Sequence, residues 1–296
     1  MGKLKAHLAV FGANLIYGIN YTVAKGVMPD YLSPFVFIGI RVVGATALFW
    51  ILAAIQRDAE RIDRKDLPYL AMLGVFGIAV NQLFFFKGLN LTTPINASII
   101  MTTNPILVLL LSALIQKERI TLLKTIGIFL AGTGALLLLT QEQTSEIALF
   151  NENYLRGNAF VLINAASYGL YLVLVKKMMN KYHPMTVIRW VFLFGLIYVI
   201  PFGASEVGAI DWREIPGHIW ASIAFVVFGT TFLAYLFNAY GIAKLKPEVV
   251  STYIYFQPIL AGIFALALGA DELNRTMVFA GVAVLMGVFA VSWQRP

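Results

Sequence analysis

The chain has 296 residues, of which 59% are hydrophobic and only 12% are charged, and its mean hydropathy is +0.79. Soluble domains are roughly 45–50% apolar and about 25% charged, so this chain has too few charged side chains to cover a water-exposed surface. With a net charge of +7 and no cysteine, the composition excludes a soluble enzyme, a nucleic-acid-binding domain and a secreted disulfide scaffold. It predicts an all-α polytopic membrane protein.

Ten apolar runs follow one another along the chain, each near the length of about 20 residues that crosses a bilayer core as a helix. They cover approximately residues 7–28, 34–55, 68–89, 94–116, 121–140, 156–177, 184–204, 218–240, 248–268 and 274–293. The longest connections, at 56–67, 141–155 and 205–217, are too short to fold as separate domains. The first run is too long for a signal peptide, so we expect a retained helix.

Lysine and arginine are distributed unevenly between the predicted connections. If the N-terminus is cytoplasmic, the inner segments hold 15 of these residues and the outer ends hold five. This bias follows the positive-inside rule and predicts that both termini lie in the cytoplasm. It also accounts for the basic charge balance, so no nucleic-acid partner is expected.

The two halves of the sequence match each other at an offset that drifts only from 151 to 154 residues. The matching pairs include Tyr17 and Tyr168, Lys25 and Lys176, Gly88 and Gly241, Pro94 and Pro247, Pro105 and Pro258, and Glu118 and Glu272. Apolar sequences align readily through Ile and Leu, but not through paired Pro, Gly, Lys and Glu. We therefore predict a first five-helix repeat at 1–140, an external linker at 141–155 and a second repeat at 156–296.

Each predicted repeat contains five spans, which is an odd number. The second copy must therefore enter the membrane from the opposite side, so the two copies form inverted repeats. Inverted repeats are typical of secondary transporters, whose substrate site lies near the bilayer midplane between the repeats. The sequence thus predicts transport by alternating access.

One motif run, Gly…Pro…Asn-Pro…Lys-Glu-Arg…Gly, extends from Gly88 to Gly134, and a counterpart runs from Gly241 to Gly281. With ten spans in two repeats, this pattern resembles the EamA family of the drug/metabolite transporter superfamily. The resemblance implies a basket-like arrangement of helices in the bacterial plasma (inner) membrane, with cytoplasmic termini. It also implies, in many members, export of amino acids or related metabolites.

Polar side chains form a stripe in the first span and another in the sixth. Asn14, Tyr17, Tyr21 and Lys25 share one face of the first span because they are three, four and four residues apart. The corresponding stripe in the sixth span contains Asn164, Ser167, Tyr168 and Tyr171. Polar groups within a span face a cavity or bond a neighbouring helix. We interpret the repeated stripes as cavity lining, with helix-to-helix bonding as the alternative.

A side-chain amide precedes proline near the middle of the fourth and ninth spans, at Asn104-Pro105 and Gln257-Pro258. Proline lacks an N–H, so the carbonyls of Met101 and Ile254 should lose their helical partners. Such carbonyls are tolerated at this depth only inside protein or beside water. We interpret both pairs as substrate-binding elements, although a simple kink would give the same pattern.

Further candidates lie in the third and eighth spans, and each could line the site or pack between helices. They are Asn81, Gln82 and Phe85 in the third span and Thr231, Tyr235 and Asn238 in the eighth. Arg41 and Arg189 lie within the second and seventh spans. Either could bind a substrate carboxylate, or could extend its charged end toward water.

Chemistry-bearing clusters are missing from the spans, which hold no deep Asp or Glu and no Cys or His cluster. We therefore expect no enzyme activity, metal or cofactor. The leading hypothesis is a secondary transporter, an exporter or facilitator of amino acids or related small metabolites. The alternatives are efflux of aromatic or drug-like compounds and a non-transporting structural or lipid-handling role. The expected partners are a small-molecule substrate and the lipid bilayer, with a monomer favoured.

Overall fold

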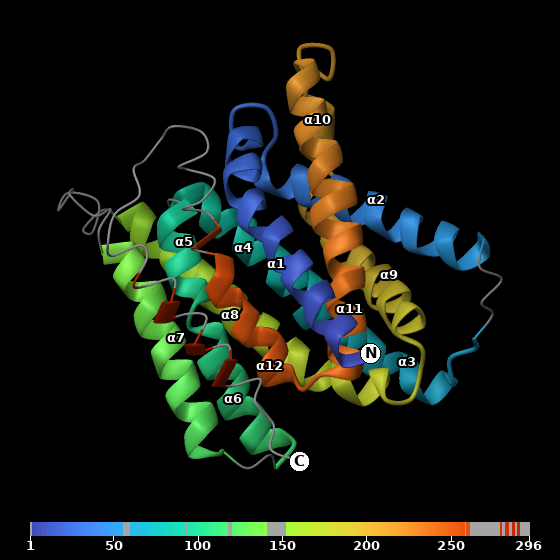
Figure 1. Cartoon of the computed structure of the whole chain (residues 1–296). Coiled ribbons are helices and arrows are strands. Elements are labelled where there is room, and N and C mark those ends of the chain that lie inside the picture. The colour runs from blue at the N-terminus through green and yellow to red at the C-terminus, as the bar shows by residue number, and fades with distance from the viewer. Residues whose placement is uncertain are drawn as a thin grey trace.

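The computed structural model describes residues 2–55, 60–92, 94–117, 120–140, 152–257 and 259–260, together with residues 279, 282–283, 286–287 and 289–290. Every regular element in this part of the chain is a helix (Figure 1). The predicted linker at 141–155 and the last predicted span lie mostly outside the described residues.

In the first half, the described residues form seven α-helices. They are α1 (Gly2–Val27), α2 (Pro34–Ile55), α3 (Leu67–Gly74), α4 (Val80–Leu91), α5 (Pro94–Met101), α6 (Asn104–Ile115) and α7 (Leu122–Thr140). The second half contains α8 (Glu152–Met179), α9 (Pro184–Gly203), α10 (Gly217–Phe225), α11 (Ala234–Lys244) and α12 (Pro247–Thr252). Proline begins α2, α5, α9 and α12 because the first turn of a helix does not need its N–H.

Several predicted spans are interrupted rather than continuous. A π-helical segment, Val75–Ala79, joins α3 to α4, and another, Val226–Leu233, joins α10 to α11. The fourth span breaks at Thr102 and Thr103, between α5 and α6, and Pro105 lies in the first turn of α6. Five helical segments within the described ranges are long and apolar enough to cross a membrane: Pro34–Ile55, Arg64–Leu91, Leu155–Met179, Pro184–Gly203 and Gly217–Lys244. The chain is therefore an all-helical membrane protein, while the count of ten spans remains a prediction.

Repeat-related lysines cap repeat-related helix ends. Lys25 Nζ, near the end of α1, donates to the carbonyls of Leu89 and Thr92 at the end of α4, at 2.9 and 3.2 Å. Lys176 Nζ, near the end of α8, donates to Ile242 and Leu245 at the end of α11. Each acceptor in α11 lies 153 residues after its counterpart in α4. The sequence repeat is thus also a repeat of contacts.

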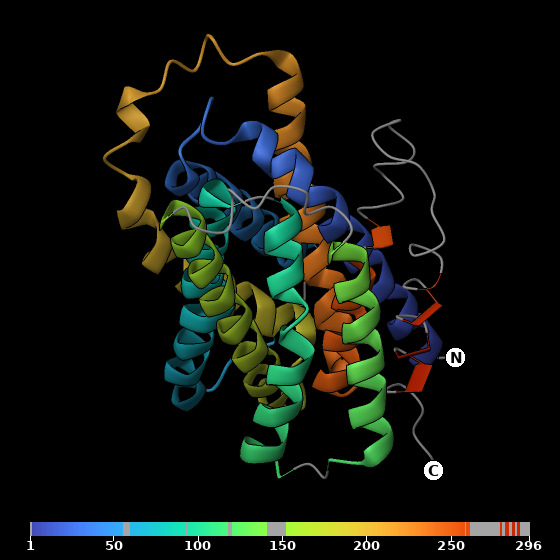
Figure 2. The same ribbon diagram turned by 90° about the vertical axis from the view of Figure 1, so that its left-hand side faces the viewer.

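These contacts show that α1 and α8 run in opposite directions. The end of α1 meets the end of α4, where Gly88 packs closely on Gly157 near the start of α8. The end of α8 meets the end of α11, where Gly241 packs closely on Val10 near the start of α1. Figures 1 and 2 show α1 lying along α11. The start of α1 and the end of α8 therefore lie at one end of the molecule, and the end of α1 and the start of α8 lie at the other.

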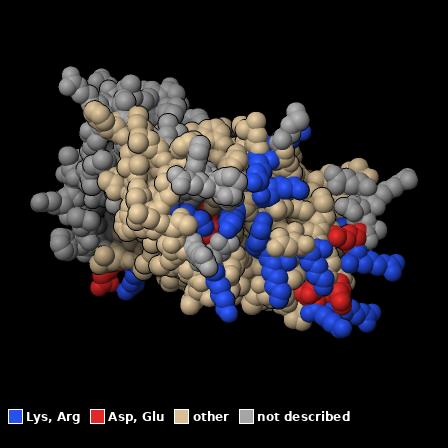
Figure 3. Space-filling view, turned by 60° about the horizontal axis from the view of Figure 1, so that its bottom comes forward, with Lys and Arg blue, Asp and Glu red and all other residues tan. Residues whose placement is uncertain are grey.

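Charged connections gather at one end of the molecule, the lower end in Figure 1. An ion pair between Lys181 and Asp66 joins the connections after α8 and α2, and Lys124 lies 3.2 Å from Glu248 Oε1. Asp66 and the Tyr182 hydroxyl raise the pKa of Lys181. Figure 3 shows lysine and arginine spread over this end.

Candidate substrate site

A cavity of about 80 Å³ lies where α1, α2, α4, α8 and α11 meet α12 and the turns that follow it. Nine of the twelve predicted site residues line it: Asn14, Tyr17, Tyr21, Arg41, Asn81, Tyr168, Tyr235, Asn238 and Gln257. They come from both halves of the chain.

The two repeat-related tyrosines meet at one asparagine. The Nδ2 atom of Asn238 in α11 lies 3.1 Å from the Tyr17 hydroxyl and 3.2 Å from the Tyr168 hydroxyl, and it donates to both. Tyr17 comes from α1 and Tyr168 from α8, so one amide links the opposed helices at the cavity wall. Each hydroxyl can still donate its own proton into the cavity.

A second hydrogen-bonded chain connects α1 to the segment after α12. Gln257 Nε2 donates to Asn14 Oδ1 at 2.8 Å, and Tyr21 donates to Gln257 Oε1 at 2.9 Å. Asn14 Nδ2 in turn donates to the Val10 carbonyl. All three side chains are buried. The chain fixes the orientation of the Gln257 amide.

Tyr235 of α11 contacts the cavity wall that the third span forms. Its hydroxyl lies 3.3 Å from the Gly77 carbonyl in the first π-helical segment and accepts a hydrogen bond from Gln82 Nε2 at 3.2 Å. Gln82 and Tyr235 are 153 residues apart, so this bond joins repeat-related positions. A π-helical turn disturbs the regular carbonyl pairing, and here it lets Gly77 accept a bond from the other half of the chain.

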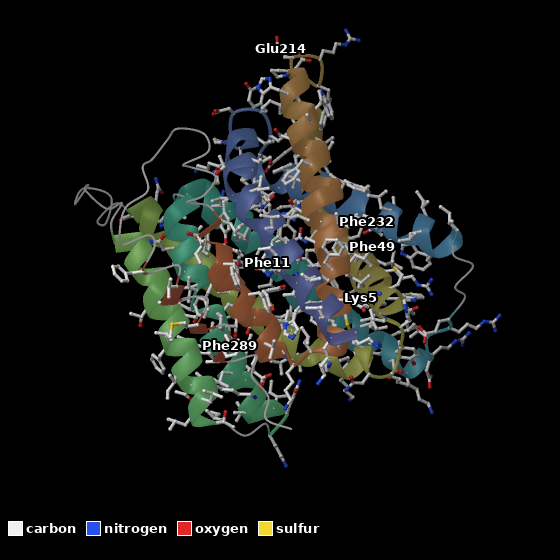
Figure 4. The ribbon with its side chains drawn as sticks, viewed as in Figure 1. Lys5, Phe11, Phe49, Glu214, Phe232 and Phe289 are labelled. Carbon is white, nitrogen blue, oxygen red and sulfur yellow. The ribbon has the colours of Figure 1, made fainter. Side chains whose placement is uncertain are left out.

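Arg41 supplies a buried positive charge to the cavity. The side chain is 3% exposed, and its guanidinium carbon lies 4.4 Å from the centre of the Phe86 ring. Its Nε donates to Thr231 Oγ1 at 2.9 Å in the second π-helical segment. Nearby, Phe49 lies against Phe232 with ring centres 4.9 Å apart (Figure 4), which holds α2 on the same segment.

The Arg41 guanidinium has no carboxylate partner among the described residues. Within the described residues, the guanidinium makes one hydrogen bond, from Nε to Thr231 Oγ1. The described side chains that line the cavity include no Asp or Glu. Burying a charge without a partner is costly. The remaining guanidinium donors therefore suit an anionic group that enters the cavity, and a carboxylate matches their planar fork.

Amide oxygens without partners provide the opposite polarity. Asn20 Oδ1, Gln82 Oε1 and Asn164 Oδ1 are buried beside the cavity and accept no hydrogen bond from the described residues. Buried polar atoms rarely remain unpaired, so these acceptors suit an ammonium or hydroxyl group of a ligand. The cavity therefore offers donors for a negative group and acceptors for a positive one.

Three predicted residues lie outside the lining. Asn104 Nδ2 donates to the Ala165 carbonyl at 2.7 Å, so this amide joins helices. The Tyr171 ring packs against Gly77, where no side chain keeps it away. Arg189 reaches the charged end of the molecule, where it donates to the Glu60 carbonyl at 3.0 Å and lies over the Trp50 ring. These three side chains contact other helices or connections, and their assignment to the substrate site stays a prediction.

The lining also includes Asn164 of the predicted stripe and Gln82 and Phe85 of the third span, which the sequence offered as candidates. Its other members are residues whose side chains the sequence analysis did not assign to the site: Asn20, Phe86, Met101, Thr230, Val250 and Ile254. The repeat offset offered a signal for Asn20, because it is equivalent to Tyr171. The apolar members carry no such signal, since a lining Phe or Val looks like any other residue of a span.

Comparison with known proteins gives the family. The model of the EamA-like transporter family matches residues 4–140 and again residues 155–293. The uncharacterized transporter YyaM of Bacillus subtilis is 26% identical over 293 residues, which cover 99% of this chain and 95% of that protein. An uncharacterized transporter of Archaeoglobus fulgidus is 28% identical over 281 residues, with 94% and 95% covered.

Structural comparison agrees with the sequence matches. One protein of known crystal structure is 18% identical and superposes with a TM-score of 0.76 over 98% of both chains, which shows a shared fold. Because the family model matches both halves and nearly the whole length, this chain belongs to the EamA-like transporter family of the drug/metabolite transporter superfamily, with two EamA domains, and is a membrane transporter rather than an enzyme.

Proposed function

We propose that this protein is a secondary transporter that moves amino acids or related small metabolites bearing a carboxylate, by alternating access through the central cavity. The observation that carries the proposal is Arg41, a buried cation in a cavity whose described lining residues include no carboxylate. A substrate carboxylate would complete the missing ion pair.

The same cavity also contains hydrogen-bond acceptors for an amino group of the substrate. The unpartnered amide oxygens of Asn20, Gln82 and Asn164 border the same cavity. A zwitterion would place its carboxylate at Arg41 and its ammonium at these oxygens. Charge-assisted hydrogen bonds of both signs would then replace the water that each group loses on entry.

The size of the cavity favours a small metabolite. One water fills roughly 10–15 Å³ on the scale used for buried cavities. A cavity of about 80 Å³ therefore holds roughly six waters, which corresponds to a small amino acid.

The antiparallel arrangement of α1 and α8 supports alternating access. Two copies of one unit in opposite directions can exchange their conformations around a fixed site. We infer inverted five-helix repeats, with both termini in the cytoplasm of a bacterial cell and the chain in its plasma membrane. The charged end with Lys181 and Asp66 would then be the cytoplasmic end.

A second candidate function is efflux of aromatic compounds. Six aromatic rings of the described residues line the cavity: Tyr17, Tyr21, Phe85, Phe86, Tyr168 and Tyr235. Such a lining suits a planar apolar ligand. Transport of an aromatic solute that lacks a carboxylate would favour this alternative.

Counterflow in proteoliposomes tests the proposal. Vesicles preloaded with a mixture of unlabelled amino acids, at equal pH on both sides, should accumulate a labelled amino acid. Arg41→Gln should slow this by at least tenfold, because a hydrogen bond to a charged group contributes about 1.5–3 kcal/mol. Arg189→Gln removes a buried arginine outside the cavity and should leave the rate within twofold. Wild-type vesicles that accumulate only solutes without a carboxylate would contradict the proposal.

A further inference from the structure

A second cavity, of about 420 Å³, opens at the charged end of the molecule. It lies between the start of α1, the end of α8 and the connection from α11 to α12. The residues that line it are Lys3, His7, Lys176, Lys244, Leu245, Lys246 and Val249. Four lysines and a histidine thus surround one opening.

Among the described residues, the lining of this cavity holds four lysines and one histidine and no Asp or Glu. The nearest acidic residue along the chain is Glu248, which is fully buried and paired with Lys124 at 3.2 Å. Cations gathered around one opening create a local potential that attracts anions. The cavity therefore has the charge of an anion site.

Local backbone geometry holds one of the cationic groups, Lys176, in place. Lys176 Nζ is anchored on the carbonyls of Ile242 and Leu245. Leu245 itself is extended, with φ −115° and ψ 167°, and its side chain is buried while Lys244 and Lys246 on either side line the cavity. The end of α8 is thus joined to the α11–α12 connection at this cavity.

The ring of His7 is fixed in the same way. Its Nδ1 lies 2.7 Å from the Tyr253 hydroxyl, on the turn that follows α12. The start of α1 and the segment after α12 are therefore already joined at the edge of this cavity.

Apolar side chains continue from the cavity along α1. Leu4 and Leu8 are 66% and 61% exposed, and they follow Lys3 and His7 at the same four-residue spacing. Neighbouring polar and apolar stripes on one helix suit a molecule with a charged head and an apolar chain. A soluble anion would use the lysines and leave the leucines uncovered.

We propose that this cavity binds the phosphate headgroup of an anionic phospholipid. Lys3 and Lys244 contact the phosphate from opposite sides, while the acyl chains lie along Leu4 and Leu8. Basic cavities between membrane helices on the cytoplasmic side hold acidic headgroups in this manner. The bound lipid would tie the start of α1 to the α11–α12 connection. This binding site is separate from the substrate cavity and does not depend on which solute is transported.

Thermal unfolding during titration with phosphatidylglycerol tests the proposal. The purified protein in neutral detergent with phosphatidylcholine should unfold at a higher temperature as phosphatidylglycerol is added, which gives an apparent affinity. Lys3→Gln with Lys244→Gln should weaken this affinity by about 25-fold, since each lysine near an acidic headgroup contributes roughly a factor of five. Lys5→Gln with Lys65→Gln removes the same charge outside the cavity and should change it less than threefold.

Two further measurements distinguish a specific lipid site from general electrostatic attraction and from a folding defect. Lys3→Arg with Lys244→Arg keeps both charges and should retain the lipid effect, and unfolding in phosphatidylcholine alone checks that each variant folds. Should the two glutamine pairs weaken the effect equally, the attraction belongs to the whole charged surface and the proposal is wrong. Inorganic phosphate that raises the unfolding temperature as much as the lipid, or a wild-type protein indifferent to phosphatidylglycerol, would also overturn it.

Discussion

Asn238 is the residue through which the two halves of the substrate cavity touch. Its single amide nitrogen donates to Tyr17 of α1 and to Tyr168 of α8. A relative movement of α1 and α8 must stretch at least one of these bonds. The amide is therefore suited to hold the halves together in one state and to release one of them in another.

Replacing this amide should affect transport more than stability. Asn238→Ala removes both bonds and should lower the free energy of unfolding by about 1–3 kcal/mol. Counterflow should fall about tenfold, because the two tyrosines lose their common partner. Asn158→Ala removes one bond at the opposite end from the charged connections, to Thr92, and serves as the control. An equal loss of counterflow in both variants would show that Asn238 has no specific role in the transport cycle.

Sequence spacing shows which side chains share a helix face but not what lies opposite that face. Tyr168 and Tyr171 belong to one predicted stripe, yet only Tyr168 lines the cavity. The Tyr171 ring turns to the third span, because Gly77 leaves a space there. Arg189 differs from Arg41 for a similar reason: its partner, the Glu60 carbonyl, belongs to a connection whose path could not be read from the sequence.

Helix crossings depend on glycines at repeat-related positions. A Cβ built on Gly88 would lie 2.9 Å from the Gly157 carbonyl oxygen and 2.7 Å from Val161, and one on Gly241 would lie 2.2 Å from Val10. Carbonyl oxygen cannot move without moving the helix. These glycines therefore set how closely α4 approaches α8 and how closely α11 approaches α1.

Gly88→Ala should therefore separate α4 from α8. Overpacking of this kind typically costs about 1–3 kcal/mol, so the unfolding temperature of the purified protein should fall. Gly39→Ala makes the matched comparison, because no neighbouring atom lies within 4 Å of its added Cβ, and a helical alanine is about 1 kcal/mol better than glycine. A Gly88→Ala protein as stable as the Gly39→Ala protein would show that the crossing can open without cost.

Helix starts and helix interruptions differ in how far the sequence predicts them. Pro34 and Pro184 mark the starts of α2 and α9 where the apolar runs begin, because proline has a local effect on the backbone. The π-helical segments carry no such local signal. One of them depends on the hydroxyl of Ser167, which donates to the Phe76 carbonyl from another helix. Such a register is set by tertiary contacts.

At the scale of the whole molecule, each end contains the same kind of lysine contact, made by a helix of the first repeat at one end and by its counterpart from the second repeat at the other. One end joins Lys25 of α1 to α4, and the other joins Lys176 of α8 to α11. If the charged end is cytoplasmic, the lysine caps lie on opposite sides of the membrane. Opening one end and closing the other would then exchange the roles of two equivalent structures, which is what alternating access requires.

The orientation of the whole molecule can be tested because the chain contains no cysteine. A single cysteine introduced at Lys65 or at Asp211 is therefore the only thiol, and both positions are exposed in connections at opposite ends. In intact cells, a membrane-impermeant maleimide should label Asp211→Cys and leave Lys65→Cys unlabelled until the cells are broken. The positive-inside bias predicts this outcome. Labelling of Lys65→Cys alone would reverse the orientation, move the lysine-rich cavity to the outer face and leave Arg41 in the substrate cavity unchanged.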